Sequence, residues 1–100
     1  MMPMAAPNYI QDMKAKEALR GEIMAQGFRY GYRNFRELGE LADIRHNTMS
    51  AHLKEPDLMR LDELRKLVRT LRLDPEVVLA ALGYNRTQIR NMRKEEEDDQ

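Results

Sequence analysis

Apolar residues along this chain recur every three or four positions, and no segment shows sustained alternation of apolar and polar residues. Spacing of three and four places side chains on one face of an α-helix, whereas a half-buried strand requires strict alternation. The sequence therefore predicts an all-α fold, a compact bundle of about five short helices. The clearest helix covers residues 61–71, with an apolar face formed by Leu61, Leu64, Leu67, Val68 and Leu71.

The first predicted helix runs from about Gln11 to Gln26 and ends at Gly27, because glycine is common just beyond a helix C-terminus. Residues 1–10 have little to bury, so we expect them to form a flexible arm. Residues 28–34 are rich in aromatic and basic side chains and are expected to form a loop. The apolar stripe of the first helix consists of Ala15, Leu19, Ile23 and Met24.

Two short helices are predicted between residues 34 and 54. Asn34 lies three residues before Glu37, a pattern typical of a helix N-terminal cap, and the helix that follows reaches about Asp43. The next helix covers residues 46–54 and ends because the ring of Pro56 cannot continue the helical hydrogen bonds. The apolar faces of the two helices consist of Leu38, Leu41 and Ala42, and of Met49 and Leu53.

The C-terminal part contains a fifth predicted helix and a charged tail. Asp74 is the expected cap, Pro75 occupies the first helical position, and the helix continues through Leu82 until Gly83 closes it. Residues 85–100 are first basic and then acidic. We predict a charged tail there, in which any helix would be frayed.

The charge of the chain is unevenly distributed, although its 17 basic and 17 acidic residues cancel. Five acids occupy residues 95–99, so residues 1–94 hold 17 basic against 12 acidic residues, a net charge of +5. A basic body with an acidic tail favours an anionic partner for the body. The tail either competes weakly with that partner or only keeps the protein in solution.

The chain lacks the features of several protein classes. It has no Cys, which excludes disulfides, thiolate catalysis and Cys-based zinc sites, and His46 and His52 lie on different sides of a helix, as surface residues that cannot share a metal. No apolar run approaches the ~18 residues of a membrane span. The N-terminus lacks the charged flank and the long apolar stretch of a secretory signal. We therefore expect a cytoplasmic protein that needs no membrane, metal or cofactor and is not an enzyme.

The central segment FRELGELADIRHNTMSAHL, residues 35–53, resembles the helix-turn-helix of the phage repressor and Cro family, often called the XRE family. The likeness extends over about residues 13–84. It implies a lambda-repressor-like fold, with a DNA-binding domain over residues 11–84. The apolar and small positions of the family's motif fall on Leu38, Gly39, Ile44 and Met49.

The resemblance implies that residues 46–54 form a recognition helix in the major groove of double-stranded DNA. Arg45 has the donors for a bidentate contact with guanine, and Asn47 has the donor and acceptor for adenine. The base-reading positions of the family fall on Arg45, His46, Asn47, Ser50, Ala51 and Lys54. Phosphate contacts are expected from Arg33, Asn34, Arg36 and Thr48.

Three features depart from the family's pattern. Asp43 stands in the turn where Gly is usual, at a position that takes a positive φ. Phe35 replaces the Gln that often opens the first helix of the motif, so a neighbouring residue must supply its phosphate contact. The connector over residues 28–34 is several residues longer than usual.

Two basic groups have alternative roles. The loop over residues 29–33 either contacts phosphate and sugar or is solvated, with one aromatic side chain packed inward. Arg65, Arg69 and Arg72 line one side of their helix, and a solvated face is favoured over a phosphate-contacting one.

The segment 77–82 is apolar on all sides, and one short helix on a small core cannot bury every side of itself. A homodimer interface is therefore expected, and the family commonly uses this helix in that way. The alternative is coverage by Tyr84, Ile89 and Met92 from a tail that folds back. The residues expected at the dimer interface are Val77, Val78, Ala81 and Leu82.

These features together predict a sequence-specific DNA-binding transcription regulator, similar to repressors and Cro-like proteins of phages and prophages. The competing interpretation is a helix-turn-helix module whose main partner is another protein, such as a toxin or a phage or host factor. The acidic tail and the long connector keep this second interpretation open.

Overall fold

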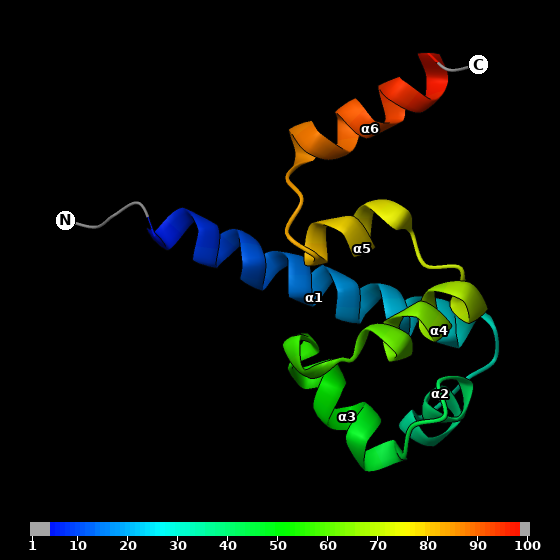
Figure 1. Ribbon diagram of the computed structural model, residues 1–100. Helices are drawn as coiled ribbons and strands as arrows, with labels where there is room; N and C mark the ends of the chain where they lie inside the picture. Colours follow the sequence, from blue (N-terminus) through cyan, green and yellow to red (C-terminus); the bar gives the residue numbers. More distant parts are fainter. Residues whose placement is uncertain (1–4, 99–100) are drawn as a thin grey trace.

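The structure is a computed structural model that describes residues 5–98, with the side chains of residues 10–92 and 94 (Figure 1). All regular structure within this range is helical, as the spacing of the apolar residues predicted. No helix in the described range is long and apolar enough to cross a membrane. The helices are α1 (Ala5–Arg29), α2 (Phe35–Leu41), α3 (His46–Lys54), α4 (Leu61–Leu71), α5 (Pro75–Ala81) and α6 (Arg86–Asp98), with a short 3₁₀ helix, η1 (Pro56–Leu58), after α3.

The hydrophobic core lies where α1, α2, α3 and α4 meet. Burying a Leu or Ile side chain contributes about 1.5–3 kcal/mol, so this cluster is the main source of stability. Met49 and Leu53 of α3 lie within it, as predicted, at 0% and 2% exposure. The core consists of Leu19, Ile23, Leu38, Ala42, Met49, Leu53, Leu64, Leu67, Leu71 and Leu73.

Helix α1 is longer at both ends than the sequence predicted. It begins at Ala5, so residues 5–10 of the expected arm are helical, while residues 1–4 lie outside the described range. The assignment of Met24 to the buried stripe was wrong, because this side chain is 45% exposed. The stripe instead follows a strict four-residue spacing through Leu19 and Ile23 to Gly27.

Gly27 does not end α1, and its small size serves packing instead. A Cβ atom at position 27 would lie 2.6 Å from Cδ2 of Leu38, so only glycine lets this core residue approach the helix. The helix ends at Arg29, and Gly31 just beyond it takes φ +92°. There the Tyr32 amide donates to the Gly27 carbonyl (2.8 Å) and the Gly31 amide to the Phe28 carbonyl (3.0 Å). These two bonds form a Schellman motif.

Helix α4 has the predicted inward face except at its first residue. Leu61 was expected to be buried but is 66% exposed, because it opens the helix beyond the edge of the core. Leu64, Leu67 and Leu71 are buried as predicted.

The two ends of α5 are capped by the residues that the sequence predicted. The Asp74 side chain accepts a hydrogen bond from the Glu76 amide (2.9 Å), and Pro75 opens the helix. Gly83, with φ +109°, closes it in a second Schellman motif. The helix ends at Ala81, one residue before the predicted end at Leu82.

Helix α6 occupies most of the predicted tail and extends away from the bundle, at the opposite end from α2 and α3 (Figure 1). A capping box that the sequence analysis missed starts it: the Gln88 amide donates to the Asn85 side chain (2.8 Å), and the Asn85 amide to the Gln88 side chain (2.9 Å). Ile89 is buried and Met92 half-buried on the side toward the bundle. The backbone is helical through Asp98, and Asp99 lies outside the described residues.

Candidate nucleic-acid interface

Helices α2 and α3 are joined by the four residues 42–45, and hydrogen bonds fix this turn. The Ile44 amide donates to the Gly39 carbonyl (2.7 Å), and the Asp43 amide to the Glu40 carbonyl (3.3 Å), which is again the Schellman pattern. Asp43 therefore takes the position that glycine usually fills, with φ +58°. The positive φ predicted for Asp43 is confirmed. The Ile44 side chain then packs against the core.

Gly39 lets the two helices and the turn approach closely. A Cβ atom at this position would overlap the carbonyl oxygen of Ile44 and would lie 3.6 Å from Cβ of Met49. The prediction of a small residue at this crossing is confirmed. The orientation of α3 relative to α2 is therefore set by backbone contact, which allows little variation.

Helix α2 begins with the predicted cap. The Glu37 amide donates to the Asn34 side-chain oxygen (2.9 Å), and Glu37 accepts in return from the Arg33 amide (3.4 Å). Asn34 also donates through its side-chain nitrogen to Glu37 (3.4 Å). Its side chain is thus engaged within the protein, which makes it a poorer phosphate ligand than its exposed neighbours Arg33 and Arg36.

Helix α3 divides its side chains sharply between core and solvent. Met49 and Leu53 are buried, whereas Asn47, Ala51 and Lys54, spaced four and three residues apart, form one exposed stripe. Ser50 beside this stripe is half-buried. The structure thus brings the six expected base-reading residues together on the first turn and outer face of α3. Those that are exposed are Arg45, His46, Asn47, Ala51 and Lys54, and Thr48 from the phosphate group is exposed beside them.

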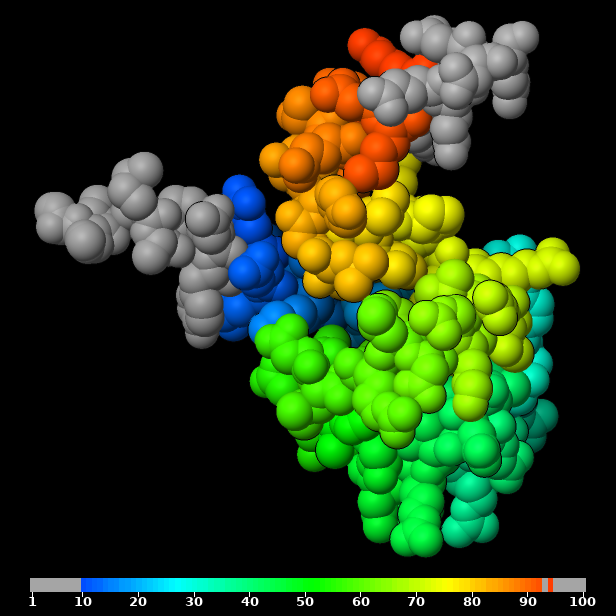
Figure 2. Space-filling view, viewed as in Figure 1, coloured from blue at the N-terminus to red at the C-terminus, as the bar shows by residue number. Residues whose placement is uncertain are grey.

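This outer face lies at one end of the molecule. Side chains from the α2–α3 part of the chain protrude there, at the lower end of the space-filling view (Figure 2). Arg45 directly precedes α3, and its exposed side chain forms no ion pair among the described residues. Arg33, Arg36 and Lys54 form no ion pair among the described residues. Glu40 and Asp43 are the exposed acids beside the turn.

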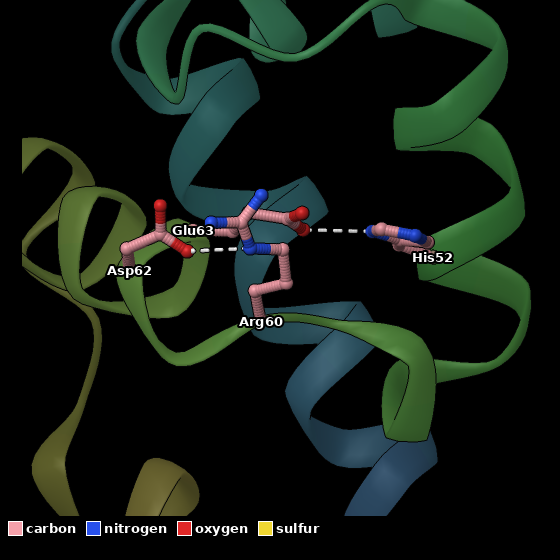
Figure 3. A network of polar contacts seen from close by, with 4 residues as sticks. All are labelled: His52, Arg60, Asp62 and Glu63. Atoms are coloured by element: carbon pink, nitrogen blue, oxygen red, sulfur yellow. Dashed lines mark hydrogen bonds and ion pairs between the residues drawn. The ribbon is translucent and has the colours of Figure 1, made fainter.

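Helix α3 is tied to α4 by a polar contact on its inner side. His52 Nδ1 lies 2.7 Å from Glu63 Oε2, and the two side chains are only 15% and 10% exposed (Figure 3). The expectation that His52 is a surface residue was wrong. His46, in contrast, is exposed as predicted.

The sequence analysis missed this pair, although a signal exists. Glu63 lies four residues before Leu67 and eight before Leu71, on the buried face of α4, and His52 lies next to Leu53. Two polar residues at the edges of facing apolar stripes indicate a contact across the core boundary. Arg60 and Asp62, also drawn in Figure 3, form an exposed ion pair (3.2 Å) beside it.

Two ion pairs link the segment just after the C-terminus of α3 to α1. Lys16 Nζ lies 2.5 Å from Asp57 Oδ2 and 3.6 Å from Glu55 Oε1. The hydrogen bond to Asp57 and the negative charges of the two carboxylates raise the pKa of Lys16 above its ordinary value. Surface ion pairs of this kind contribute little stability but orient the chain where α3 ends.

The residues expected at a dimer interface lie in different surroundings. Val77, Val78 and Ala81 are half-buried and pack against the core of the same chain, while Leu82 is 52% exposed. Helix α6 packs on α5, with Ile89 buried, and Tyr84 remains 41% exposed. The chain therefore covers α5 in part, and no residue of α5 is fully buried.

Comparison with protein-family models, with curated proteins and with solved structures finds no significant match to this chain. The argument for its function therefore rests on the geometry of α2 and α3 and on the side chains they expose. These side chains offer a chemistry suited to base edges and phosphates, because they combine positive charge, an amide and small residues on one rigid helix.

Proposed function

We propose that this protein is a sequence-specific, double-stranded DNA-binding regulator of transcription, built on a lambda-repressor-like helix-turn-helix of the XRE type. The observation that carries this proposal is the division of α3. Two side chains anchor the helix in the core, while Asn47, Ala51 and Lys54 remain exposed along its outer face. A helix held in this way presents a fixed set of side chains to a major groove.

The exposed residues have distinct roles in this proposal. Arg45 donates to a guanine and Asn47 pairs with an adenine, each through two hydrogen bonds. Ser50 and Ala51 are small, so the helix backbone approaches the bases and Ala51 meets a thymine methyl group. His46 and Lys54 contact base edges at either end of the helix. Phosphate contacts come from Arg33, Arg36 and Thr48 on both sides of the groove.

The regulator acts as a homodimer in this proposal, because two copies related by a twofold axis read two half-sites of an operator. Exposed Leu82 and the half-covered residues of α5 are the surface through which the copies associate. The expected setting is the cytoplasm of a cell that carries a phage or prophage, and the output is repression or activation. Regulation then depends on protein concentration and dimerisation.

The proposal is tested by selecting duplexes from a random-sequence pool and measuring their affinity. A sequence-specific regulator enriches one motif with twofold symmetry and binds it about 10³-fold or more tightly than a scrambled duplex. Binding measured by fluorescence anisotropy at two salt concentrations separates this specificity from simple charge attraction. Enrichment of no motif, or equal affinity for both duplexes, would contradict the proposal.

A second candidate function is a protein-interaction module, as the sequence also allowed. One observation favours it. Leu61 and Leu82 are 66% and 52% exposed and line a cavity of about 170 Å³ between α1, α4 and α5. Exposed apolar side chains at a cavity are common at protein interfaces. A protein that fails the DNA selection but binds a helical peptide through these leucines would have this function.

A further inference from the structure

The end of α1, the connector of residues 30–34 and the start of α2 together expose an unusual concentration of aromatic and arginine side chains. Four of the six aromatic residues of the chain lie within residues 28–35. Phe28 is 78% exposed, Tyr30 47% and Phe35 38%. Residues 23–36 contain three arginines and no acid or lysine, a net charge of +3. We name the connector surface by its exposed residues, which are Phe28, Arg29, Tyr30, Arg33, Phe35 and Arg36.

The connector surface is held in a fixed shape by its ends. At one end the Schellman motif at Gly31 closes α1, and Tyr32 directly after it packs against the core. At the other end the reciprocal bonds between Asn34 and Glu37 start α2. A ligand therefore meets a preorganised surface, and less ordering entropy opposes binding.

The arginines of this surface are not paired with acidic side chains in the described part of the chain. Among the described residues, Arg29, Arg33 and Arg36 form no ion pair. The acids that flank the segment accept hydrogen bonds from neutral amides and not from these arginines: Glu22 accepts from the Asp74 amide (2.8 Å), and Glu37 accepts from the Arg33 amide (3.4 Å). Charge of one sign on a rigid surface favours a polyanion over a protein partner, whose charges are mixed.

We propose that the connector surface binds the sugar-phosphate backbone of DNA outside the base pairs read by α3. The arginines contact phosphates, and the aromatic rings pack against the faces of the deoxyriboses. The connector runs from the end of α1 to the start of α2, the helix that precedes α3 (Figure 1). This inference rests on the proposed function, and it lengthens the DNA footprint by Phe28, Arg29 and Tyr30, which precede the helix-turn-helix motif and have no role in the contacts proposed above.

The test uses two duplexes, one that ends with the selected site and one that extends a helical turn beyond it on each side. Wild-type protein binds the longer duplex more tightly. The Arg29→Ala and Arg33→Ala variants each lower the slope of log affinity against log salt by about 1 on the longer duplex, because one fewer counterion is released. Phe28→Ala weakens binding to that duplex about tenfold and leaves the slope unchanged, since an apolar contact releases no counterion.

Matched controls come from exposed residues at other places on the chain. Arg90→Ala on α6 removes the same charge at the far end of the molecule, and Ile10→Ala removes an exposed apolar side chain from α1. Both variants bind the longer duplex as the wild type does. Circular dichroism melts verify that each variant is folded, and Arg29→Gln replaces Arg29→Ala if the shorter side chain weakens α1.

Two negative results have different meanings. Wild-type protein that binds neither duplex would overturn the proposed function together with this inference. Wild-type protein that binds the selected site, with connector variants that keep its affinity and salt slope on both duplexes, would overturn this inference alone.

Discussion

Helices α3 and α5 are similar in length, yet they bury their side chains in opposite ways. Helix α3 places Met49 and Leu53 in the core at 0% and 2% exposure and leaves its outer face in solvent. Helix α5 has no buried residue, and its five positions from Val77 to Ala81 are all partly exposed. A helix with one fully buried face holds its exposed side chains in fixed positions. A helix that is partly exposed on every side is suited to gaining a further partner.

The largest expected effect concerns how much a side chain of each helix contributes to the free energy of unfolding. Met49→Ala should lower the free energy of unfolding by about 2–5 kcal/mol, because it opens a cavity in a filled core. Val78→Ala removes a half-buried side chain and should cost about 1 kcal/mol. Urea denaturation of both variants measures the difference. Equal losses would show that α3 is no better anchored than α5.

The second prediction concerns the partner of α5. Leu82→Glu should weaken self-association by about 2–4 kcal/mol, because it places a charge in the proposed dimer interface, and should leave each copy folded. Light scattering over a concentration series measures the dissociation constant. Thr70→Glu, at an exposed position on α4, is the control and should dimerise normally. A wild-type protein that stays monomeric at the highest concentration would contradict the proposed homodimer.

A third prediction tests the close approach that orients α3. Gly39→Ala should cost about 1–3 kcal/mol, because the added methyl group meets the Ile44 carbonyl and the turn must shift. Gly21→Ala is the matched control, since nothing lies within 4 Å of that position in α1. The control should stabilise the protein by about 0.5–1 kcal/mol through helix propensity. Similar effects of both substitutions on thermal unfolding would contradict the steric argument.

The smallest effect concerns the strained turn before α3. Asp43→Gly should raise the free energy of unfolding by roughly 0.5 kcal/mol, because glycine adopts φ +58° without strain. Gly83→Ala is the opposite change just beyond the end of α5, at φ +109°, and should destabilise by about 1 kcal/mol. Denaturation midpoints for the two variants should therefore move in opposite directions. A destabilised Asp43→Gly variant would show that the aspartate side chain has a further role in the turn.

The sequence predicted the features that depend on neighbours along the chain. The caps at Asn34 and Asp74 and the stop at Gly83 were all placed correctly, because each depends on a few adjacent residues. The bounds of α3 were also predicted correctly, since Pro56 and the spacing of Met49 and Leu53 define them locally.

Features that depend on distant contacts were predicted poorly. Gly27 was predicted to end a helix, which was wrong. Its role is to make room for Leu38, eleven residues further along, and this contact between two helices is not visible in the local sequence. The pairing of His52 with Glu63 and the exposure of Leu61 depend in the same way on how α3 and α4 pack. For the candidate site, the sequence predicted its residue types and helix, and the structure added which of its side chains are free to bind.

The measurement that tests the central claim most directly is the affinity of the Asn47→Ala variant for the selected duplex and for a scrambled duplex. The account predicts a loss of about 1–3 kcal/mol, about 5- to 150-fold, on the selected duplex and an unchanged affinity for the scrambled one. Arg45→Ala should behave in the same way, and Thr70→Ala on α4 should change neither affinity. Equal losses of Asn47→Ala on both duplexes, or no loss on either, would contradict base reading by the outer face of α3.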